Sequence, residues 1–512
     1  MLVKTYGSAV FGIEATIITV EVNVTQGAKY YLVGLPDNAV KESQQRIHSA
    51  LRHHNYKMPG KKVIVNMAPA DIRKEGSAYD LTIAIGILAA SEQINNEGIE
   101  NFVIMGELSL DGSLMPIKGV LPIAIKAREQ GFKGIILPKE NAREAAIVND
   151  LEVYGVENIK EVIDFIENTI PIEPTIVNTR EEFLANLSKA DFDFSDVRGQ
   201  ESVKRALEIA AAGGHNILMI GPPGAGKTML AKRIPTILPP LSLREALETT
   251  KIHSVAGVLD KDTSLLTIRP YRAPHHTISD VALVGGGTFP QPGEISLAHN
   301  GVLFLDELPE FKRTVLEVMR QPLEDRHITV SRAKFTVDYP ASFMLVSSMN
   351  PCPCGYYNHP EKECVCTPGI VQKYLNKISG PLLDRIDIHI EVIPVPFSKL
   401  SETGEAEKSE HIRERVISAR EIQIKRFEKH NEIHCNAQMS SKILRKYAPI
   451  SRDGSNLLKN AMEKFGLSAR AYDRIIKVSR TVADLDNSPE IKTEHLAEAI
   501  QYRSLDRENW AG

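Results

Sequence analysis

The feature that most constrains this chain is a glycine-rich segment that follows a short apolar run. Residues 216–220 read Asn-Ile-Leu-Met-Ile, and residues 221–228 read Gly-Pro-Pro-Gly-Ala-Gly-Lys-Thr, which has the form GxxxxGK[ST]. A strand that enters such a turn and leaves it as a helix presents backbone N–H groups to an anion, and the helix N-terminus adds a favourable dipole. The sequence therefore predicts a loop that binds the phosphates of a nucleoside triphosphate.

The residues of this loop have separate predicted roles. Lys227 is expected to reach the terminal phosphates, and the Thr228 hydroxyl is expected to hold Mg²⁺. The other residues of the loop are expected to bind the nucleotide by surrounding its phosphates: Gly221, Pro222, Pro223, Gly224, Ala225 and Gly226. We therefore predict ATP and Mg²⁺ as cofactors.

Length and charge set the general class of the protein. With 512 residues the chain is too long for one hydrophobic core, so about two to four domains are expected. The net charge of −4 gives no general attraction to nucleic acid, so any such binding has to come from a local basic surface. The chain shows no apolar run that could span a bilayer and no signal-peptide profile at its N-terminus, which predicts a cytoplasmic protein with no membrane partner.

Residue patterns divide the chain into domains. Residues 1–170 alternate short strands with helices, as in an α/β domain, and the proline-containing residues 171–195 are typical of a linker. Residues 196–395 form a second α/β domain around the glycine-rich loop. Residues 396–512 begin with a polar, loop-like stretch at 398–410 and then have helical patterns to near residue 505, so we expect a small all-α lid domain at the end.

Continuous apolar runs in the second domain predict a parallel sheet that is buried on both faces. These runs are residues 216–220, 301–305 and 343–348. Asp306 and Glu307 follow the second run and Asn350 follows the third, where ligands gather in α/β sheets. Asp306 is expected to hold Mg²⁺ through water, and Glu307 is expected to orient or deprotonate the attacking water. Asn350 is expected to contact the γ-phosphate or that water.

Together these segments resemble the AAA+ ATPases, and region 191–395 is similar to their magnesium-chelatase-like branch. The matching segments are DVRGQ at 196–200, GPPGAGKT at 221–228, GVLFLDELPEF at 301–311, MNPCPCG at 349–355 and LLDRIDIHIEV at 382–392. The resemblance implies an arginine finger at Arg385 that completes the active site of a neighbouring subunit. It implies a sensor arginine in the helical lid, for which Arg470 matches best and Arg474 is the alternative, although either could form a structural ion pair. A shared active site implies a ring, which we expect to be a homo-hexamer.

Residues 327–340 alternate apolar and polar side chains on both sides of a Ser-Arg-Ala-Lys tip, which predicts a β-hairpin. In the resembling AAA+ branch a hairpin at this place projects into the central pore. Arg332 and Lys334 at the tip suit contacts to a DNA phosphate backbone, and the alternative is a solvated turn with two surface bases. Residues 269–287 resemble an insertion in the second helix of this branch, which could line the same pore.

Four of the five cysteines occur close together, as two C-x-C pairs separated by nine residues. They are Cys352, Cys354, Cys364 and Cys366. Four thiolates from one loop can form a tetrahedral structural Zn²⁺ site, although the spacing departs from the usual C-x₂-C arrangement. The alternative is a set of reduced thiols without a metal.

The N-terminal domain resembles the protease domain of Lon at residues 105–117 and 131–141. Lon uses a serine and a lysine as a catalytic dyad. Ser77 is displaced by about one position from the place of that serine, and the place of the lysine falls near Leu121, with Lys118 three residues too early. Because a serine hydroxyl without a base is a poor nucleophile at neutral pH, we expect a non-proteolytic domain with the Lon-like fold.

The order of these domains resembles the YifB/ComM family over nearly the full chain. The resemblance implies an ATP-driven hexameric DNA motor, with helicase or branch-migration activity on single-stranded or branched DNA, that works during natural transformation with a recombinase as a further partner. The alternatives are a magnesium or cobalt chelatase-type motor subunit, an ATP-dependent protease and a chaperone-like ring that remodels proteins.

Overall fold

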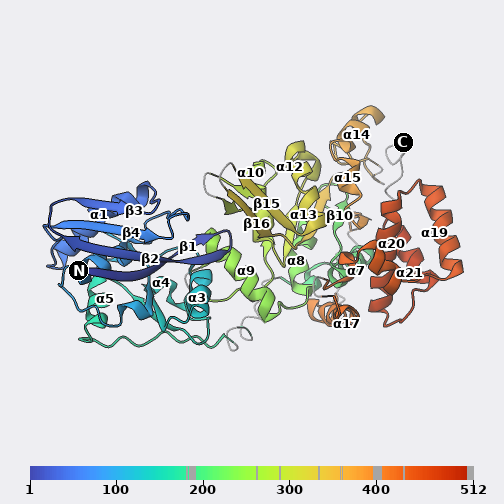
Figure 1. Cartoon of the computed structure of the whole chain (residues 1–512). Helices are drawn as coiled ribbons and strands as arrows, with labels where there is room; N and C mark the ends of the chain where they lie inside the picture. The colour runs from blue at the N-terminus through green and yellow to red at the C-terminus, as the bar shows by residue number, and fades with distance from the viewer. Residues whose placement is uncertain are drawn as a thin grey trace. The chain divides into compact units, whose positions relative to one another are not determined.

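The structure is a computed structural model of the chain, shown in Figure 1. It describes residues 1–179, 183, 192–260, 263–287, 290–332, 335–357, 359, 361–395, 406–430 and 433–503. The chain forms two compact units. The N-terminal unit contains Met1–Leu187 and Leu243–Thr267, and the C-terminal unit contains Ser188–Ser242 and Ile268–Gly512.

The N-terminal unit is built on a seven-stranded mixed sheet in the order β3-β4-β2-β1-β5-β8-β9. Neighbouring strands among β1, β2 and β4 are antiparallel, and the other neighbouring pairs are parallel. The strands are β1 (Leu2–Phe11), β2 (Glu14–Thr25), β3 (Tyr30–Val33), β4 (Lys62–Ala68), β5 (Phe102–Ile104), β8 (Gly134–Pro138) and β9 (Glu152–Val156). The mixed α/β character expected for this part of the chain is thereby confirmed.

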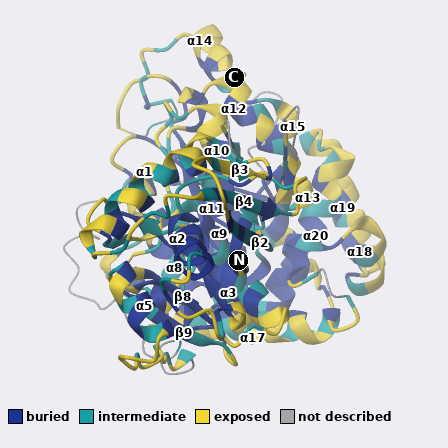
Figure 2. Cartoon of the chain, turned by 60° about the vertical axis from the view of Figure 1, so that its left-hand side comes forward, coloured by how far each residue is buried: buried dark blue, intermediate teal, exposed yellow. Residues whose placement is uncertain are grey.

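Helices cover this sheet, and one of them is apolar on all sides. Every residue of α2 is buried, as the dark colour in Figure 2 shows, and Gly86 lies so near the sheet that a Cβ there would be 2.7 Å from Val22 Cγ2. The helices are α1 (Asn38–His53), α2 (Asp80–Ala90), α3 (Val120–Glu129), α4 (Lys139–Ala145) and α5 (Ile159–Ile166). A short ribbon of β6 (Glu107–Leu108) and β7 (Leu114–Met115) follows α2.

A later segment of the chain completes the N-terminal unit. Helix α9 (Leu243–Ala256) packs on α3, where the Gly119 N–H donates to the Ser254 carbonyl at 3.1 Å. The Lys251 Nζ of α9 lies 3.4 Å from Glu14 Oε1. Leu243–Thr267 falls inside the predicted 196–395 domain, but the structure groups it with the N-terminal unit because its contacts are made there.

The C-terminal unit contains a five-stranded parallel sheet in the order β11-β14-β17-β10-β18. Its strands are β11 (Tyr271–Arg272), β14 (Val302–Leu305), β17 (Met344–Met349), β10 (Ile217–Ile220) and β18 (Ile388–Glu391). All residues of β10, β14 and β17 are buried, which confirms the three predicted apolar strands to within one residue at each end. The helices near the sheet are α7 (Glu201–Gly213), α8 (Lys227–Ile237), α10 (Asp280–Val284), α11 (Glu294–Leu297), α12 (Arg313–Val318), α13 (Arg320–Asp325), α14 (Pro368–Leu375) and α15 (Gly380–Leu383).

The predicted hairpin is present, as β15 (His327–Arg332) paired antiparallel with β16 (Phe335–Pro340). The last residues of the C-terminal unit form a helical lid, whose described part contains helices and one isolated bridge, from Ile450 to Ile491. The lid helices are α17 (Ser409–Phe427), α18 (Ser441–Tyr447), α19 (Arg452–Phe465), α20 (Ala469–Leu485) and α21 (Thr493–Gln501).

The predicted 171–195 linker ends within the C-terminal unit. Phe194 is fully buried in the core of that unit, and both carboxylate oxygens of Asp193 accept the Ser409 N–H at the start of α17 at 3.2 Å. This contact joins the lid to the rest of the unit. Residues 180–182 and 184–191 of the predicted linker lie outside the described residues.

Candidate nucleotide-binding site

The glycine-rich loop connects β10 to α8 at the carboxyl edge of the parallel sheet. Gly224 and Gly226 have φ angles of 80° and 89°, in the left-handed region that glycine adopts most readily. Helix α8 begins at Lys227, so its free N–H groups and its dipole are available to an anion bound by the loop. This is the strand–loop–helix arrangement that the motif predicts.

The Lys227 side chain lies folded over the loop. Its Nζ donates to the Gly221 and Pro222 carbonyls at 2.6 and 2.9 Å and to Asn350 Oδ1 at 3.1 Å. Burial lowers the pKa of Lys227, and the nearby Asp306 and Glu307 carboxylates oppose that change. A triphosphate would give this buried ammonium group the strong anionic partner that it lacks.

Asp306, at the end of β14, is held beside the loop. Its Oδ2 accepts from the Thr228 hydroxyl at 2.7 Å, and its Oδ1 accepts from the Ser348 hydroxyl and from the Glu307 N–H, the latter at 3.1 Å. The β-strand register explains this meeting, because β14 pairs with β17 and β17 pairs with β10. A hydroxyl and a carboxylate at this distance suit the oxygen preference of Mg²⁺, so Thr228 and Asp306 fit the predicted metal.

Glu307 has a φ angle of 54°, in the left-handed region that is costly for a residue with a side chain. Its Oε2 lies 3.5 Å from His276 Nδ1. His276 is therefore close enough to Glu307 to affect its predicted role in orienting water.

Two neighbours of this site were not predicted. Ser348 contacts Asp306 and His276 contacts Glu307, as the distances above show. Ser348 lies on the predicted strand β17, which Asn350 follows. Its contact with Asp306 could not be predicted in the same way, because that contact depends on which strands are neighbours in the sheet. The His275 and His276 rings lie 4.1 Å apart.

Arg385 follows α15 and is only 5% exposed. Its Nη2 lies 2.6 Å from Glu324 Oε1 of α13, and its Nη1 donates to the Pro381 carbonyl at 2.5 Å. The structure thus shows Arg385 paired within its own chain. Its predicted action on a neighbouring subunit stays a prediction.

The two arginines proposed for the lid differ in their surroundings. Arg470, near the start of α20, is exposed, and its Nη1 lies 3.9 Å from Asp384 Oδ2. Arg474 forms a 2.8 Å ion pair with the buried Asp387, which also lies 3.0 Å from His215. Burial disfavours charge on Asp387, but Arg474 and His215 outweigh it and lower the pKa of Asp387 far below its usual range. Arg474 thus forms a buried ion pair within its own chain, and the sensor role of Arg470 stays a prediction.

Residues 269–287, which resemble an insertion that could line a pore, include a strand of the core sheet. Tyr271 stacks on Phe304 at 6.2 Å, and Arg272 forms a bidentate pair with Glu294 at 2.6 and 2.7 Å. These two residues belong to β11, which pairs with β14. These contacts hold Tyr271 and Arg272 within their own chain, and the expectation that residues 269–287 line a pore stays a prediction.

The predicted hairpin packs its apolar side chains inward. Val330, Val337 and Tyr339 are buried, and the Tyr339 hydroxyl donates to the Pro290 carbonyl at 2.7 Å. Arg332 ends β15 and its side chain is not described, and Lys334 lies outside the described residues. The predicted DNA contacts of these two bases stay predictions.

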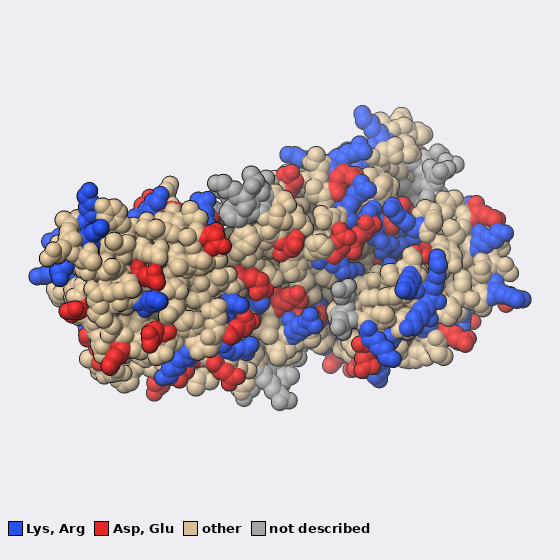
Figure 3. All heavy atoms as spheres, viewed as in Figure 1, with Lys and Arg blue, Asp and Glu red and all other residues tan. Residues whose placement is uncertain are grey.

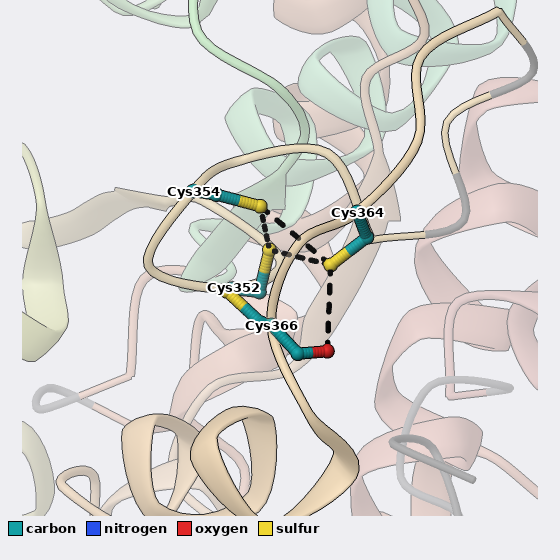
Figure 4. A group of neighbouring side chains, drawn as sticks. All are labelled: Cys352, Cys354, Cys364 and Cys366. Carbon is teal, nitrogen blue, oxygen red and sulfur yellow. Dashed lines mark hydrogen bonds between the residues drawn. The ribbon is translucent and has the colours of Figure 1, made fainter.

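The four clustered cysteines come together beside this site. The sulfur atoms of Cys352, Cys354, Cys364 and Cys366 all lie within 4.8 Å of one another. Figure 4 shows the four side chains converging from the two ends of one loop. All four are free thiols, and Cys435 is buried elsewhere in the C-terminal unit.

The Lon-like catalytic dyad is not formed in the described part of the N-terminal unit. The Ser77 hydroxyl donates to a Glu107 carboxylate oxygen rather than to a lysine. At the place of the lysine, the Leu121 N–H donates to the buried Glu144 at 2.9 Å, and α9 covers the adjacent start of α3. Lys118 has an exposed side chain and does not take the place of that base.

Among the described residues we find no helix with both the length and the apolarity that crossing a bilayer requires.

Models of the magnesium chelatase family match most of the chain. The model described as "Magnesium chelatase, subunit ChlI" matches residues 193–400, "Subunit ChlI of Mg-chelatase" matches residues 20–141, and "Magnesium chelatase, subunit ChlI C-terminal" matches residues 406–503. The AAA+ fold expected for the second domain is consistent with these matches and with the parallel sheet. Together with the glycine-rich loop, they indicate an ATPase that uses Mg²⁺.

Curated relatives extend this similarity to nearly the whole chain. The chain is 45% identical to "Competence protein ComM" of Haemophilus influenzae over 98% of its own length and 97% of the relative, and 44% identical to "Uncharacterized protein YifB" of Escherichia coli over 98% and 96%. It is also 30% identical to "Lon protease 2" of Bacillus subtilis over 161 residues, which cover 30% of this chain and 28% of that relative. The chain belongs to the YifB/ComM family of magnesium-chelatase-like AAA+ proteins.

Proposed function

We propose that this protein is an ATP-hydrolysing DNA motor that forms a homo-hexameric ring and promotes branch migration. The observation that carries the proposal is the arrangement of Lys227, Thr228, Asp306 and Asn350 around one loop, in a chain that matches a competence protein over nearly its full length. The first part supports hydrolysis of a magnesium nucleotide. The second part supports a role in the recombination of incoming DNA during natural transformation, in the cytoplasm and with a recombinase as a partner.

The hairpin of β15 and β16 is the proposed DNA contact. Buried apolar residues anchor this hairpin. The sequence has two bases at the turn between its strands, Arg332 and Lys334. On the face of Figure 3, basic and acidic side chains are intermixed over both units, in line with the net charge of −4. DNA affinity is therefore expected to come from a few local bases rather than from the general charge of the protein.

The hairpin variant Arg332→Ala/Lys334→Ala tests this contact. We expect weaker binding of fluorescent single-stranded DNA, and a salt dependence that is less steep by about 0.7 for each phosphate group that the variant no longer neutralises. The DNA stimulation of ATP hydrolysis is expected to fall with the affinity. The measurement is a set of binding isotherms at several salt concentrations, together with hydrolysis rates with and without DNA.

The matched control for this variant is Lys459→Ala/Lys464→Ala on the lid helix α19, which removes the same charge from an exposed surface. Its affinity and salt dependence are expected to equal those of the unchanged protein. Equal salt slopes for the hairpin variant and the unchanged protein would show that the hairpin does not touch the DNA backbone.

A chelatase-type motor subunit is the second candidate, because the matching family models describe a magnesium chelatase subunit. Such a motor uses ATP to help insert a metal into a tetrapyrrole. DNA is not expected to change its hydrolysis rate, so the same measurement separates the two candidates.

The cofactors of the proposed DNA motor are ATP and Mg²⁺, together with a structural Zn²⁺ at the four clustered cysteines.

A further inference from the structure

We propose that Cys352, Cys354, Cys364 and Cys366 bind one zinc ion, and that this ion holds their loop against the nucleotide-binding site so that ATP hydrolysis depends on it. The second half of this inference rests on the proposed ATPase function. The first half rests on the cysteines alone.

Three of the four sulfur atoms are spaced nearly as in a zinc tetrathiolate, and the fourth, of Cys366, lies within 4.8 Å of each of them. A regular tetrahedron with Zn–S bonds of about 2.3 Å has sulfur–sulfur edges of about 3.8 Å. The structure has 3.3 Å between Cys352 and Cys354, 3.7 Å between Cys352 and Cys364, and 3.6 Å between Cys354 and Cys364. A disulfide bond is about 2.05 Å long, so these pairs are not disulfides.

Other side chains of the C-terminal unit pack around the cysteine cluster, so it does not lie on an open surface. Cys352 is fully buried and packs with Val371, Leu375 and Tyr357. The described residues between Pro351 and Cys366 form turns and bends without a helix or strand, and α14 starts at Pro368, directly beyond the last cysteine. Because this loop has no regular hydrogen-bonded structure of its own, a metal bound at its two ends would supply most of its order.

The same loop contacts the nucleotide-binding site at its first turn. Gly355 has a φ of 85°, and a Cβ placed there would lie 2.5 Å from Pro223 Cδ, so the loop backbone packs directly on the glycine-rich loop. The Gly355 N–H donates to the Cys352 carbonyl at 3.0 Å, which ties this contact to a metal ligand. A shift of the cysteines would therefore move the surface on which Pro223 rests.

A second connection runs through Asn350, which precedes Cys352 by two residues. Its Oδ1 accepts from Lys227 Nζ at 3.1 Å. Burial raises the pKa of Tyr374 of α14, and the nearby Asn350 backbone opposes that change. The segments on both sides of the cluster thus meet at Asn350. We infer that the zinc ion positions Asn350 and the glycine-rich loop but takes no part in the reaction, since Zn²⁺ with four protein ligands has no open position for water.

The test uses the purified full-length protein. We expect about one zinc ion per chain by elemental analysis, and a cobalt-substituted protein with the absorption bands of a tetrahedral thiolate site. Cys364→Ser and Cys366→Ser are expected to lose zinc and to hydrolyse ATP roughly tenfold or more slowly, because small displacements of reacting groups are costly.

Two further variants separate metal loss from misfolding. Cys435→Ser changes a buried cysteine outside the cluster and is expected to keep both zinc and hydrolysis. Cys366→His supplies another good zinc ligand and is expected to recover zinc and most of the hydrolysis rate that Cys366→Ser loses.

If the unchanged protein contains no zinc and shows no cobalt bands after substitution, the proposed metal site is wrong. Zinc that can be removed with no change in hydrolysis would overturn the coupling and leave the metal site standing. Zinc-loaded protein that hydrolyses no ATP, with or without DNA, would remove the proposed function and the coupling, while the cobalt spectrum would still decide the metal site.

Discussion

Replacing Lys227 with alanine is expected to lower the rate of ATP hydrolysis by roughly 10²- to 10³-fold, the size of effect seen when a preorganised charge is removed from a transition state. The Lys227 ammonium group lies within hydrogen-bond distance of Gly221, Pro222 and Asn350, where the terminal phosphates of a nucleotide are expected. The measurement is phosphate release at saturating ATP and Mg²⁺.

Lys232→Ala is the matched control, because Lys232 is an exposed lysine on the same helix, α8. It is expected to hydrolyse ATP like the unchanged protein. A second readout is thermal stability: ATP is expected to raise the Tm of the unchanged protein and of Lys232→Ala, but not of Lys227→Ala, because a ligand stabilises only a fold that binds it. Unreduced hydrolysis by Lys227→Ala would show that the nucleotide site is elsewhere.

Arg385→Ala is expected to reduce hydrolysis by about 10³-fold, the lower end of the range for an arginine finger. In this single chain Arg385 is paired with Glu324. A finger that acts on a neighbour must exchange that partner for the phosphate of the next subunit. The rate is measured at protein concentrations at which rings form, and native mass is measured in parallel.

Mixing two inactive variants tests whether the site is shared. Lys227→Ala subunits retain Arg385, and Arg385→Ala subunits retain Lys227. In randomly mixed rings about a quarter of the interfaces would combine an intact loop with an intact finger, so part of the activity is expected to return. No recovery in mixed rings of normal mass would place the function of Arg385 within its own subunit, where the Glu324 pair already holds it.

The sequence was sufficient for the parts of the fold that depend on local pattern. The apolar strands β10, β14 and β17 and the β15–β16 hairpin follow from periodicity and agree with the structure. The closeness of Thr228 and Asp306 follows from the rule that ligands gather at the carboxyl ends of parallel strands.

Features that depend on tertiary packing were not predictable in this way. The placement of α9 in the N-terminal unit is set by its contacts with α3, which no periodicity in either helix reveals. The strand of Tyr271 and Arg272 was not predicted, because a two-residue edge strand leaves no periodic signal. The contact of Ser348 with Asp306 depends on the order of strands in the sheet, which the chain order alone does not specify.

The two long strands β1 and β2 of the N-terminal unit were not predicted, because only short strands were expected there. β2 alternates buried and more exposed side chains over most of its twelve residues, so a signal was present. β1 has a less regular pattern, because Gly7, Ser8 and Ala9 occupy consecutive positions in its centre. Small residues there allow close packing, since a Cβ at Gly7 would lie 3.0 Å from Met105 Sδ.

The most direct test of the proposed motor is branch migration of a synthetic three-strand DNA joint, followed by gel electrophoresis as labelled single strand is released. We predict release with ATP and Mg²⁺, no release with a non-hydrolysable ATP analogue, and no release by Lys227→Ala. Release at the same rate without ATP, or no release by a protein that hydrolyses ATP and binds the joint, would contradict the proposal that this chain is an ATP-driven DNA motor.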